Sequence, residues 1–378
     1  MTDQPGFTSF ETDRSLVEQH LVELTRIPRP CHSKELETAR QYVTLHFEDY
    51  GWDVRRHDFD VLNDVGELNL GENLHGTNLI ATRRETFDAS RPRLCLGAHL
   101  DSRPDTPGAD DNASGVAVLL NLADRLNVKN SKAEIKDNNN YLFMAFSGEE
   151  MGLLGSNYFS KNPTIDAKSI NYMINMDMVG RMKADSTLAV YGVGTSPMFK
   201  QTLKSNNDKF KLVQNESGVG PSDHTSFYLI DVPVLHFFTG QHEDYHKPSD
   251  DSEKLNYAGM HLISDYIFEI ISDLNDNGKL AFRKTKNESE ETPRFKVGLG
   301  VVPDYLFDGK GMRIDGTRED TPAYSAGLQK GDVVIKLGDS AVTDMMSYMR
   351  ALSVFEKGNK APIIVKRGTK MIETEVQF

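Results

Sequence analysis

Residues 93–101 have the sequence Arg-Leu-Cys-Leu-Gly-Ala-His-Leu-Asp, and residues 108–115 have the sequence Gly-Ala-Asp-Asp-Asn-Ala-Ser-Gly. The first is a short apolar run that ends in a histidine and an aspartate, which is typical of a buried strand. The second places three carboxylate or amide side chains before an apolar helix, more than a helix cap requires. Because ligands of open α/β sheets lie beyond the carboxyl ends of the strands, these groups predict a site at that edge.

Three further apolar runs later in the chain also end in acidic residues or lead to histidines. They are residues 141–150, ending in Glu149 and Glu150, residues 171–177, ending in Asp177, and residues 232–238, which lead to Asp244, Tyr245 and His246. A single such placement would mean little, but four in order predict one site assembled from several strand ends.

Glu149 and Glu150 are the most informative pair. Neighbouring side chains that leave a strand point in opposite directions, so the two carboxylates can take different roles. One can bind a metal ion while the other accepts a proton from metal-bound water. The alternative is a solvated acidic turn, which fits poorly with the apolar residues on both sides.

The other polar residues have simpler interpretations when each is taken alone. His99 resembles a packing histidine, Asp177 a partner in a structural ion pair, and His246 an exposed histidine. Residues 110–112 can cap a helix, but a carboxylate there can also bridge two cations. We expect Asp101 to support the His99 imidazole rather than to bind metal itself. Together, carboxylates and imidazoles without a thiolate suit Zn²⁺, Co²⁺ or Mn²⁺ in a hydrolytic site.

Strands and helices alternate along most of the chain. We expect strands at residues 52–60, 77–83, 93–99, 140–147, 170–176, 188–191 and 232–238, and helices at residues 13–26, 33–50, 112–126, 152–159, 196–204, 222–229 and 253–274. This alternation predicts an α/β fold with a central mixed, mostly parallel sheet flanked by helices.

The composition changes at residues 283–293, a charged stretch without an apolar residue that is typical of a linker. We therefore predict a first domain at residues 1–282 and a small β-rich domain at residues 294–378, with one helix at 344–351. A chain of 378 residues fits two domains.

The formal net charge of −13 argues against a nucleic-acid-binding surface and gives no basic patch for anionic lipid. No apolar run approaches the roughly 20 residues that a transmembrane helix needs. The first residues lack the basic and apolar regions of a signal peptide, so the protein is either cytosolic or has lost a leader. Cys31 and Cys95 do not have metal-binding spacing.

The polar motifs resemble, in the same order, those of the di-zinc aminopeptidases of the bacterial leucyl-aminopeptidase type in peptidase clan MH. The resemblance covers about residues 10–275. The matching motifs are His-Leu-Asp-Ser at 99–102, Gly-Ala-Asp-Asp-Asn-Ala-Ser-Gly at 108–115, Ser-Gly-Glu-Glu at 147–150, Asp-Met at 177–178, Ser-Asp-His at 222–224 and Tyr-His-Lys-Pro-Ser-Asp at 245–250.

This resemblance implies a set of metal ligands. Asp111 would bridge two Zn²⁺ ions, with Co²⁺ or Mn²⁺ as substitutes. His99 and Asp177 would complete one site, and Glu150 and His246 would complete the other. The domain at residues 1–282 would then be a di-zinc aminopeptidase domain, and its substrates would be peptides with a free N-terminus.

The resemblance also implies catalytic roles. Glu149 corresponds to the general base and proton shuttle, and Tyr245 would help to stabilise the tetrahedral intermediate. Asp101, the expected partner of His99, is the third residue of this catalytic set. The peptide bond between Asp111 and Asn112 is expected to be cis. Since members of this family are mostly exported, the resemblance favours the periplasm or secretion, although a cytoplasmic location stays open.

The C-terminal segment resembles a PDZ domain. Residues 297–301, Val-Gly-Leu-Gly-Val, are similar to the loop that binds a peptide's terminal carboxylate, and residues 325–332, Ser-Ala-Gly-Leu-Gln-Lys-Gly-Asp, are similar to a bacterial PDZ signature. The resemblance implies a PDZ-like domain that binds a peptide C-terminus as an added strand. A module that only caps the catalytic domain is the alternative.

Three other functions stay open from the sequence. A glutaminyl cyclase-like acyltransferase has the same fold but favours tryptophans around its substrate, and Trp52 is the only tryptophan here. A binding protein with an inactive peptidase fold would have lost metal ligands, and all are present. A carboxypeptidase or dipeptidase would need a cation for the substrate carboxylate, which Arg181 could supply.

Overall fold

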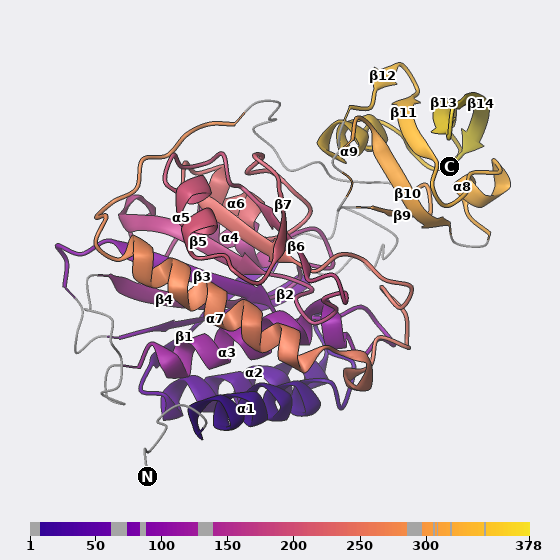
Figure 1. Cartoon of the computed structure of the whole chain (residues 1–378). Coiled ribbons are helices and arrows are strands. Elements are labelled where there is room, and N and C mark those ends of the chain that lie inside the picture. The colour runs from indigo at the N-terminus through magenta and orange to yellow at the C-terminus, as the bar shows by residue number, and fades with distance from the viewer. Residues whose placement is uncertain are drawn as a thin grey trace, which may run out of the picture. The chain divides into compact units, whose positions relative to one another are not determined.

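The computed structural model describes residues 8–61, 74–83, 88–127, 139–285, 297–304, 307, 309–317, 320–343 and 345–378 (Figure 1). The chain forms two compact units. One comprises Met1–Val61, Leu74–Thr239 and Asp244–Lys286, and the other consists mainly of Asn287–Phe378. Most of the proposed linker at 283–293 lies outside the described residues, so the predicted domain boundaries stay a proposal.

The first unit is built on a mixed sheet with the strand order β1-β2-β4-β3-β5-β8-β6-β7. Four neighbouring pairs are parallel (β4 with β3, β3 with β5, β5 with β8, β6 with β7) and the other three are antiparallel. The predicted α/β class and mostly parallel sheet are therefore confirmed. The strands are β1 (Asp53–Val61), β2 (Leu74–Thr82), β3 (Arg93–His99), β4 (Asn140–Phe146), β5 (Ile170–Met176), β6 (Thr187–Tyr191), β7 (Lys211–Gln214) and β8 (Val234–Phe238).

Helices cover both faces of this sheet (Figure 1). Helix α3 packs on β3 and β5, α7 lies beside α3, and α1 contacts both helices, whereas α4 and α6 pack together on the other side. The helices are α1 (Thr8–Leu24), α2 (Lys34–Asp49), α3 (Gly115–Arg125), α4 (Leu154–Lys161), α5 (Phe199–Ser205), α6 (His224–Tyr228) and α7 (Tyr257–Leu274), with short turns at Ala109–Ser114 (η1), Ala167–Ser169 (η3) and Ser252–Lys254 (η4).

The central strands are buried along their whole length, which explains why their sequences are apolar runs rather than alternating patterns. Strand β7 was not predicted, because it is a four-residue edge strand whose end residues, Lys211 and Gln214, are exposed. Helix α3 begins at Gly115 rather than at Asn112. A Cβ atom at Gly115 would lie 2.4 Å from the carbonyl oxygen of Met176, so only glycine allows this approach of helix and sheet.

The second unit is an antiparallel sheet with the order β14-β13-β11-β10-β9, with β12 pairing with β11. Its elements are β9 (Val301–Pro303), β10 (Met312–Thr317), α8 (Pro322–Ser325), β11 (Val333–Leu337), β12 (Ser340–Ala341), α9 (Met345–Ser353), β13 (Lys360–Arg367) and β14 (Lys370–Gln377). The predicted small β-rich domain with a helix after residue 343 is confirmed.

A buried carboxylate organises the start of β11. Asp332 is fully buried, and its Oδ2 accepts a hydrogen bond of 2.9 Å from the backbone N–H of Gln329. Arg367 donates to both Asp332 oxygens, at 2.6 and 2.7 Å, and to the carbonyl of Gly327. The Gly-Asp signature of this segment therefore has a structural explanation, since the aspartate closes the turn and joins it to β13.

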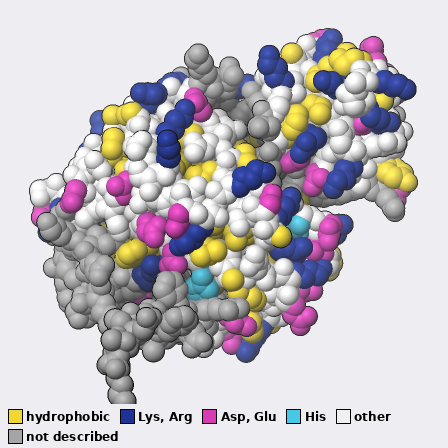
Figure 2. Space-filling view, viewed as in Figure 1, with side chains coloured by type: hydrophobic (Ala, Val, Ile, Leu, Met, Phe, Trp, Pro, Cys, Tyr) yellow, Lys and Arg dark blue, Asp and Glu magenta, His cyan; other side chains and the backbone are white. Residues whose placement is uncertain are grey.

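On the face drawn in Figure 2, acidic and basic side chains are interspersed and the exposed hydrophobic groups are small and scattered. Among the described residues, no helix is both long enough and apolar enough to cross a membrane. Cys31 and Cys95 are both free thiols.

Candidate metal centre

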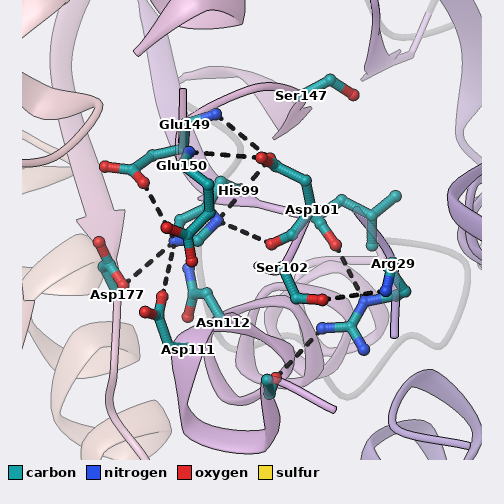
Figure 3. A network of polar contacts seen from close by, with 12 residues as sticks. Arg29, His99, Asp101, Ser102, Asp111, Asn112, Ser147, Glu149, Glu150 and Asp177 are labelled. Carbon is teal, nitrogen blue, oxygen red and sulfur yellow. Dashed lines mark hydrogen bonds and ion pairs between the residues drawn. The ribbon is translucent and has the colours of Figure 1, made fainter. Parts of the chain in front are cut away.

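Polar residues from several segments meet at the carboxyl edge of the sheet. Because β3, β4, β5 and β8 are parallel to one another, their C-terminal ends lie at the same edge. His99 is the last residue of β3, Glu149 and Glu150 follow β4, and Asp177 follows β5 directly. Asp111 lies in η1 before α3 (Figure 3).

These side chains form two groups that share one carboxylate. In the first group, the Nε2 atom of His99 lies 3.3 Å from Asp111 Oδ1 and 3.3 Å from Asp177 Oδ1. In the second, the Nε2 atom of His246 lies 3.1 Å from Asp111 Oδ2 and 3.2 Å from Glu150 Oε2. Within each group the donor atoms all lie within 4.8 Å of one another. Asp111 thus turns one oxygen toward each histidine, as a bridging ligand would.

The cluster concentrates negative charge in a buried place. Burial alone would lower the pKa of His99, but Asp177, Glu149 and Asp111 raise it well above its ordinary value. Burial likewise opposes the charge on His246, whereas Glu150 and Asp111 raise its pKa to about 9. Burial and the neighbouring Asp111 raise the pKa of Glu150 to about 7. These shifts mean that the carboxylates attract a positive charge, which a metal cation can supply in place of protons.

The imidazole of His99 is oriented by the backbone. Its Nδ1 atom donates to the carbonyl oxygen of Asp101 at 3.1 Å, which leaves Nε2 facing the carboxylates. The Asp101 carboxylate is farther away, with its Oδ1 at 3.8 Å from Nδ1. It accepts instead from the backbone N–H groups of Glu149 and Glu150, at 3.3 Å each (Figure 3). The expected support for His99 therefore comes mainly from the Asp101 carbonyl, while the carboxylate holds the turn that carries the two glutamates.

Asp177 is positioned by Ser222, a residue to which the sequence analysis assigned no role. The hydroxyl of Ser222 donates to Asp177 Oδ2 at 2.7 Å and accepts from Asn175 Nδ2 at 2.8 Å. All three residues are buried. Ser222 belongs to the Ser-Asp-His motif, which was the one sequence signal for it.

Glu149 and Tyr245 flank the two groups. Glu149 Oε2 lies 3.9 Å from His99 Nε2. Burial and the neighbouring carboxylates of Asp177 and Glu150 raise the pKa of Glu149 well above its ordinary value. The ring of Tyr245 stacks on His246, with ring centroids 3.7 Å apart. The peptide bond between Asp111 and Asn112 is cis, which confirms that expectation.

Two residues that bear on the alternative functions have other partners. Arg181 Nη1 donates to Asp244 Oδ2 at 3.1 Å, so its guanidinium group is engaged by a protein carboxylate. Trp52 packs against Tyr141 and Phe143, and its Nε1 donates to the carbonyl of Ala123 at 3.0 Å. The tryptophan therefore lies in the hydrophobic core rather than beside the metal ligands.

Comparisons with known proteins match both segments of the chain to families. Residues 78–271 match the profile of peptidase family M28, and residues 282–378 match that of the PDZ domain. Aminopeptidase YwaD of Bacillus subtilis is 31% identical over 231 residues, which are 57% of this chain and 49% of that protein. The chain thus aligns with only about half the length of this relative.

Solved structures show the same fold. The zinc aminopeptidase BSAP from Bacillus subtilis superposes with a TM-score of 0.60 at 15% identity, covering 74% of this chain and 97% of that one. Glutaminyl cyclase from Porphyromonas gingivalis gives a TM-score of 0.57 at 18% identity, covering 70% and 97%. These likenesses establish the fold, and the matching profiles confirm the family resemblance of both segments. The chain belongs to peptidase family M28 and carries a PDZ domain at its C-terminal end.

Proposed function

We propose that the chain is a zinc-dependent aminopeptidase that removes N-terminal residues from peptides by means of two cations. The observation that carries this proposal is the pair of ligand groups that share Asp111. Family membership and the relative named as an aminopeptidase support the same activity.

The donor set fits a pair of zinc ions. His99, Asp111 and Asp177 would hold one ion, and Asp111, Glu150 and His246 would hold the other. The Oε1 atom of Glu150 is buried and has no hydrogen-bond partner among the described residues, as expected for an atom that binds a cation. When bound, zinc supplies Lewis acidity and lowers the pKa of a bound water.

Glu149 would move the proton in this reaction. Its carboxylate accepts a proton from the attacking water as the water oxygen bonds to the peptide carbonyl carbon. Its raised pKa suits it to keep that proton and then to pass it to the leaving amine when the C–N bond breaks. Tyr245, which stacks on His246, would donate a hydrogen bond to the carbonyl oxygen as that oxygen becomes negative.

The surroundings of the site favour a free amino terminus. The carboxylates of Glu149, Glu150 and Asp177 lie together and would attract the α-ammonium group of a peptide. Since Arg181 is engaged by Asp244, the residue considered for a substrate carboxylate is already occupied. A carboxypeptidase or dipeptidase is therefore less well supported than an aminopeptidase.

A glutaminyl cyclase is the second candidate, because such an enzyme shares the fold at a similar TM-score. The position of Trp52 argues against it, since the one tryptophan of the chain is part of the core. For the C-terminal domain, we propose that a peptide terminus pairs with β9, which lies at the edge of its sheet and follows the loop at residues 297–300.

The test is a panel of peptides with free and blocked N-termini, incubated with wild type and Glu149→Ala, with and without zinc. The proposal predicts release of amino acids from free termini only, and loss of this activity in Glu149→Ala although the variant still binds zinc. A parallel assay with N-terminal glutamine peptides detects cyclisation. Zinc-loaded wild type that cyclises glutamine and releases no amino acid would replace the aminopeptidase with the second candidate.

A further inference from the structure

Arg29 is a fully buried arginine that the proposed reaction does not use. Its side chain donates hydrogen bonds to four backbone carbonyls. The Nε atom donates to Leu100 at 3.0 Å, Nη1 to Pro107 at 2.8 Å and also to Leu24, and Nη2 to Gly108 at 3.1 Å. A guanidinium group can do this because it offers five N–H donors in a rigid fork.

These carbonyls belong to the segments that carry two of the expected ligands. Leu100 directly follows His99, and Gly108 precedes η1, which contains Asp111. The backbone adds to the connection, since Arg29 N donates to Ser102 Oγ at 2.9 Å and Ser102 N donates to the Arg29 carbonyl at 3.1 Å (Figure 3). Arg29 therefore joins the end of β3 to the start of η1.

Asp250 holds the same segment from its other end. It is fully buried, and its carboxylate accepts from the backbone N–H of Asp110 at 3.1 and 3.2 Å and from that of Asp111 at 3.1 Å. Its carbonyl accepts from Ala109 N at 3.1 Å. Because Asp250 is only four residues beyond His246, it also ties the loop of the second ligand group to Asp111.

The charges suit the backbone groups that they meet. The cation of Arg29 faces the carbonyl oxygens of Pro107 and Gly108, and the anion of Asp250 faces the N–H groups of Asp110 and Asp111. Burial lowers the pKa of Arg29 to about 10, while Asp101, Asp250 and Asp111 act to raise it, so the side chain stays cationic at neutral pH. Hydrogen bonds to charged partners are stronger than those between neutral groups.

We propose that Arg29 and Asp250 form a clamp on residues 107–111 that fixes the Asp111 carboxylate between the two ligand groups and thereby sets the affinity for cations. The inference rests on the proposed function, in which Asp111 is a shared ligand. Both residues are positioning residues, because they act through the backbone of the ligand segment. Partners that orient metal ligands typically contribute about 10- to 100-fold to metal affinity or activity.

The experiment is a titration of the metal-free full-length protein with Co²⁺, followed by visible absorbance, at a temperature where circular dichroism shows each variant folded. Arg29→Lys keeps the charge but loses the fork, and Asp250→Asn keeps the size but loses the charge. The control is Arg125→Lys on α3, since Arg125 donates to Asp265 and Ser264, outside the ligand segments. Both clamp variants should bind Co²⁺ about 10- to 100-fold more weakly, with a changed absorption spectrum, and the control should bind as wild type does.

If Arg29 and Asp250 only stabilise the fold, the metal-free variants will have a lower melting temperature but an unchanged Co²⁺ affinity and spectrum. This result, with wild type binding two cations, would overturn the clamp. If Arg29→Lys does not fold, Asp250→Asn decides by the same criteria. Wild type that binds no cation would overturn both the clamp and the proposed function. Wild type that binds only one cation would contradict the shared role of Asp111 and would overturn the clamp, while a metal-dependent peptidase would still stand.

Discussion

The metal centre and the PDZ domain both bury acidic side chains, but they balance the charge differently. In the PDZ domain, Asp332 is matched by Arg367, which donates to both of its oxygens. In the metal centre, the carboxylates of residues 111, 149, 150 and 177 contact two imidazoles among the described residues, those of His99 and His246. Arg103 adds a half-exposed cation 3.7 Å from Glu150. A buried acid that the protein neutralises has a structural role, whereas a buried excess of acids indicates a site for an added cation.

The largest effect should follow from Asp111→Asn, which removes the shared charge. Asparagine keeps one oxygen and replaces the other by an NH2 group that does not bind zinc, so both ligand groups lose the negative charge and one of them loses a ligand atom. We expect the variant to retain at most one cation after dialysis and to have only the activity of the metal-free protein. Elemental analysis and peptide hydrolysis check this. A variant that keeps two zinc ions would show that Asp111 is not their common ligand.

Asp332→Asn tests the other side of the comparison. It leaves Arg367 facing an amide and should destabilise the PDZ domain by about 1–3 kcal/mol. Since no metal ligand is expected in that domain, zinc content and hydrolysis of short peptides should stay at the wild-type level. Denaturant unfolding followed in parallel with zinc content measures both effects, and loss of zinc would contradict the separation of roles.

A smaller effect is expected from Ser222→Ala. The substitution removes the hydrogen bond to Asp177 Oδ2 but leaves every expected ligand in place. Metal affinity should fall about 10-fold, at the lower end of the range for groups that orient ligands. Competition with a chelator measures the change. An unchanged affinity would mean that Asp177 is held by the strand end alone.

The smallest effect concerns pH and the protein without metal. The pKa of Glu150 is raised to about 7 and that of His246 to about 9, so both groups bind protons more tightly in the folded state than in the unfolded chain. The stability that they contribute is present at low pH and is lost as the pH rises through these values. Burial lowers the pKa of His20 to about 3 and that of His236 to about 4, so these two groups make stability rise with pH up to about 6.5. The melting temperature of the metal-free protein should therefore fall between about pH 7 and pH 9, where His246 loses its proton, and added zinc should reduce this fall. A melting temperature that rises over this window would contradict the assigned directions.

Most of the fold could be predicted because buried parallel strands such as residues 93–99 and 170–176 are continuous apolar runs. The exposed edge strand at Lys211–Gln214 lacks that signal. His99, Glu149, Glu150 and Asp177 could be predicted as one site because they lie at or just after the ends of strands that end at one edge of the sheet. Asp111 in η1 and His246 in a loop do not follow strands directly, and the motifs that resemble the family indicated their roles.

The interactions that hold these residues could not be predicted in the same way. Arg29 and Asp250 bond mainly to backbone groups, which are the same at every residue. The motif at residues 245–250 therefore included Asp250 without indicating its role, and no motif included Arg29. The Asp101 carboxylate likewise accepts hydrogen bonds from the backbone N–H groups of Glu149 and Glu150, and it lies farther from the His99 ring. The turn of the chain after β3 causes this arrangement.

The most direct test of the central claim is the number of zinc ions that the wild-type chain binds. Metal-free protein should be titrated with zinc by calorimetry, and the bound metal should then be measured by elemental analysis. We predict two ions per chain, because Asp111 presents one oxygen to each ligand group. Binding of one ion would contradict the shared carboxylate, and binding of none would contradict the metal centre itself.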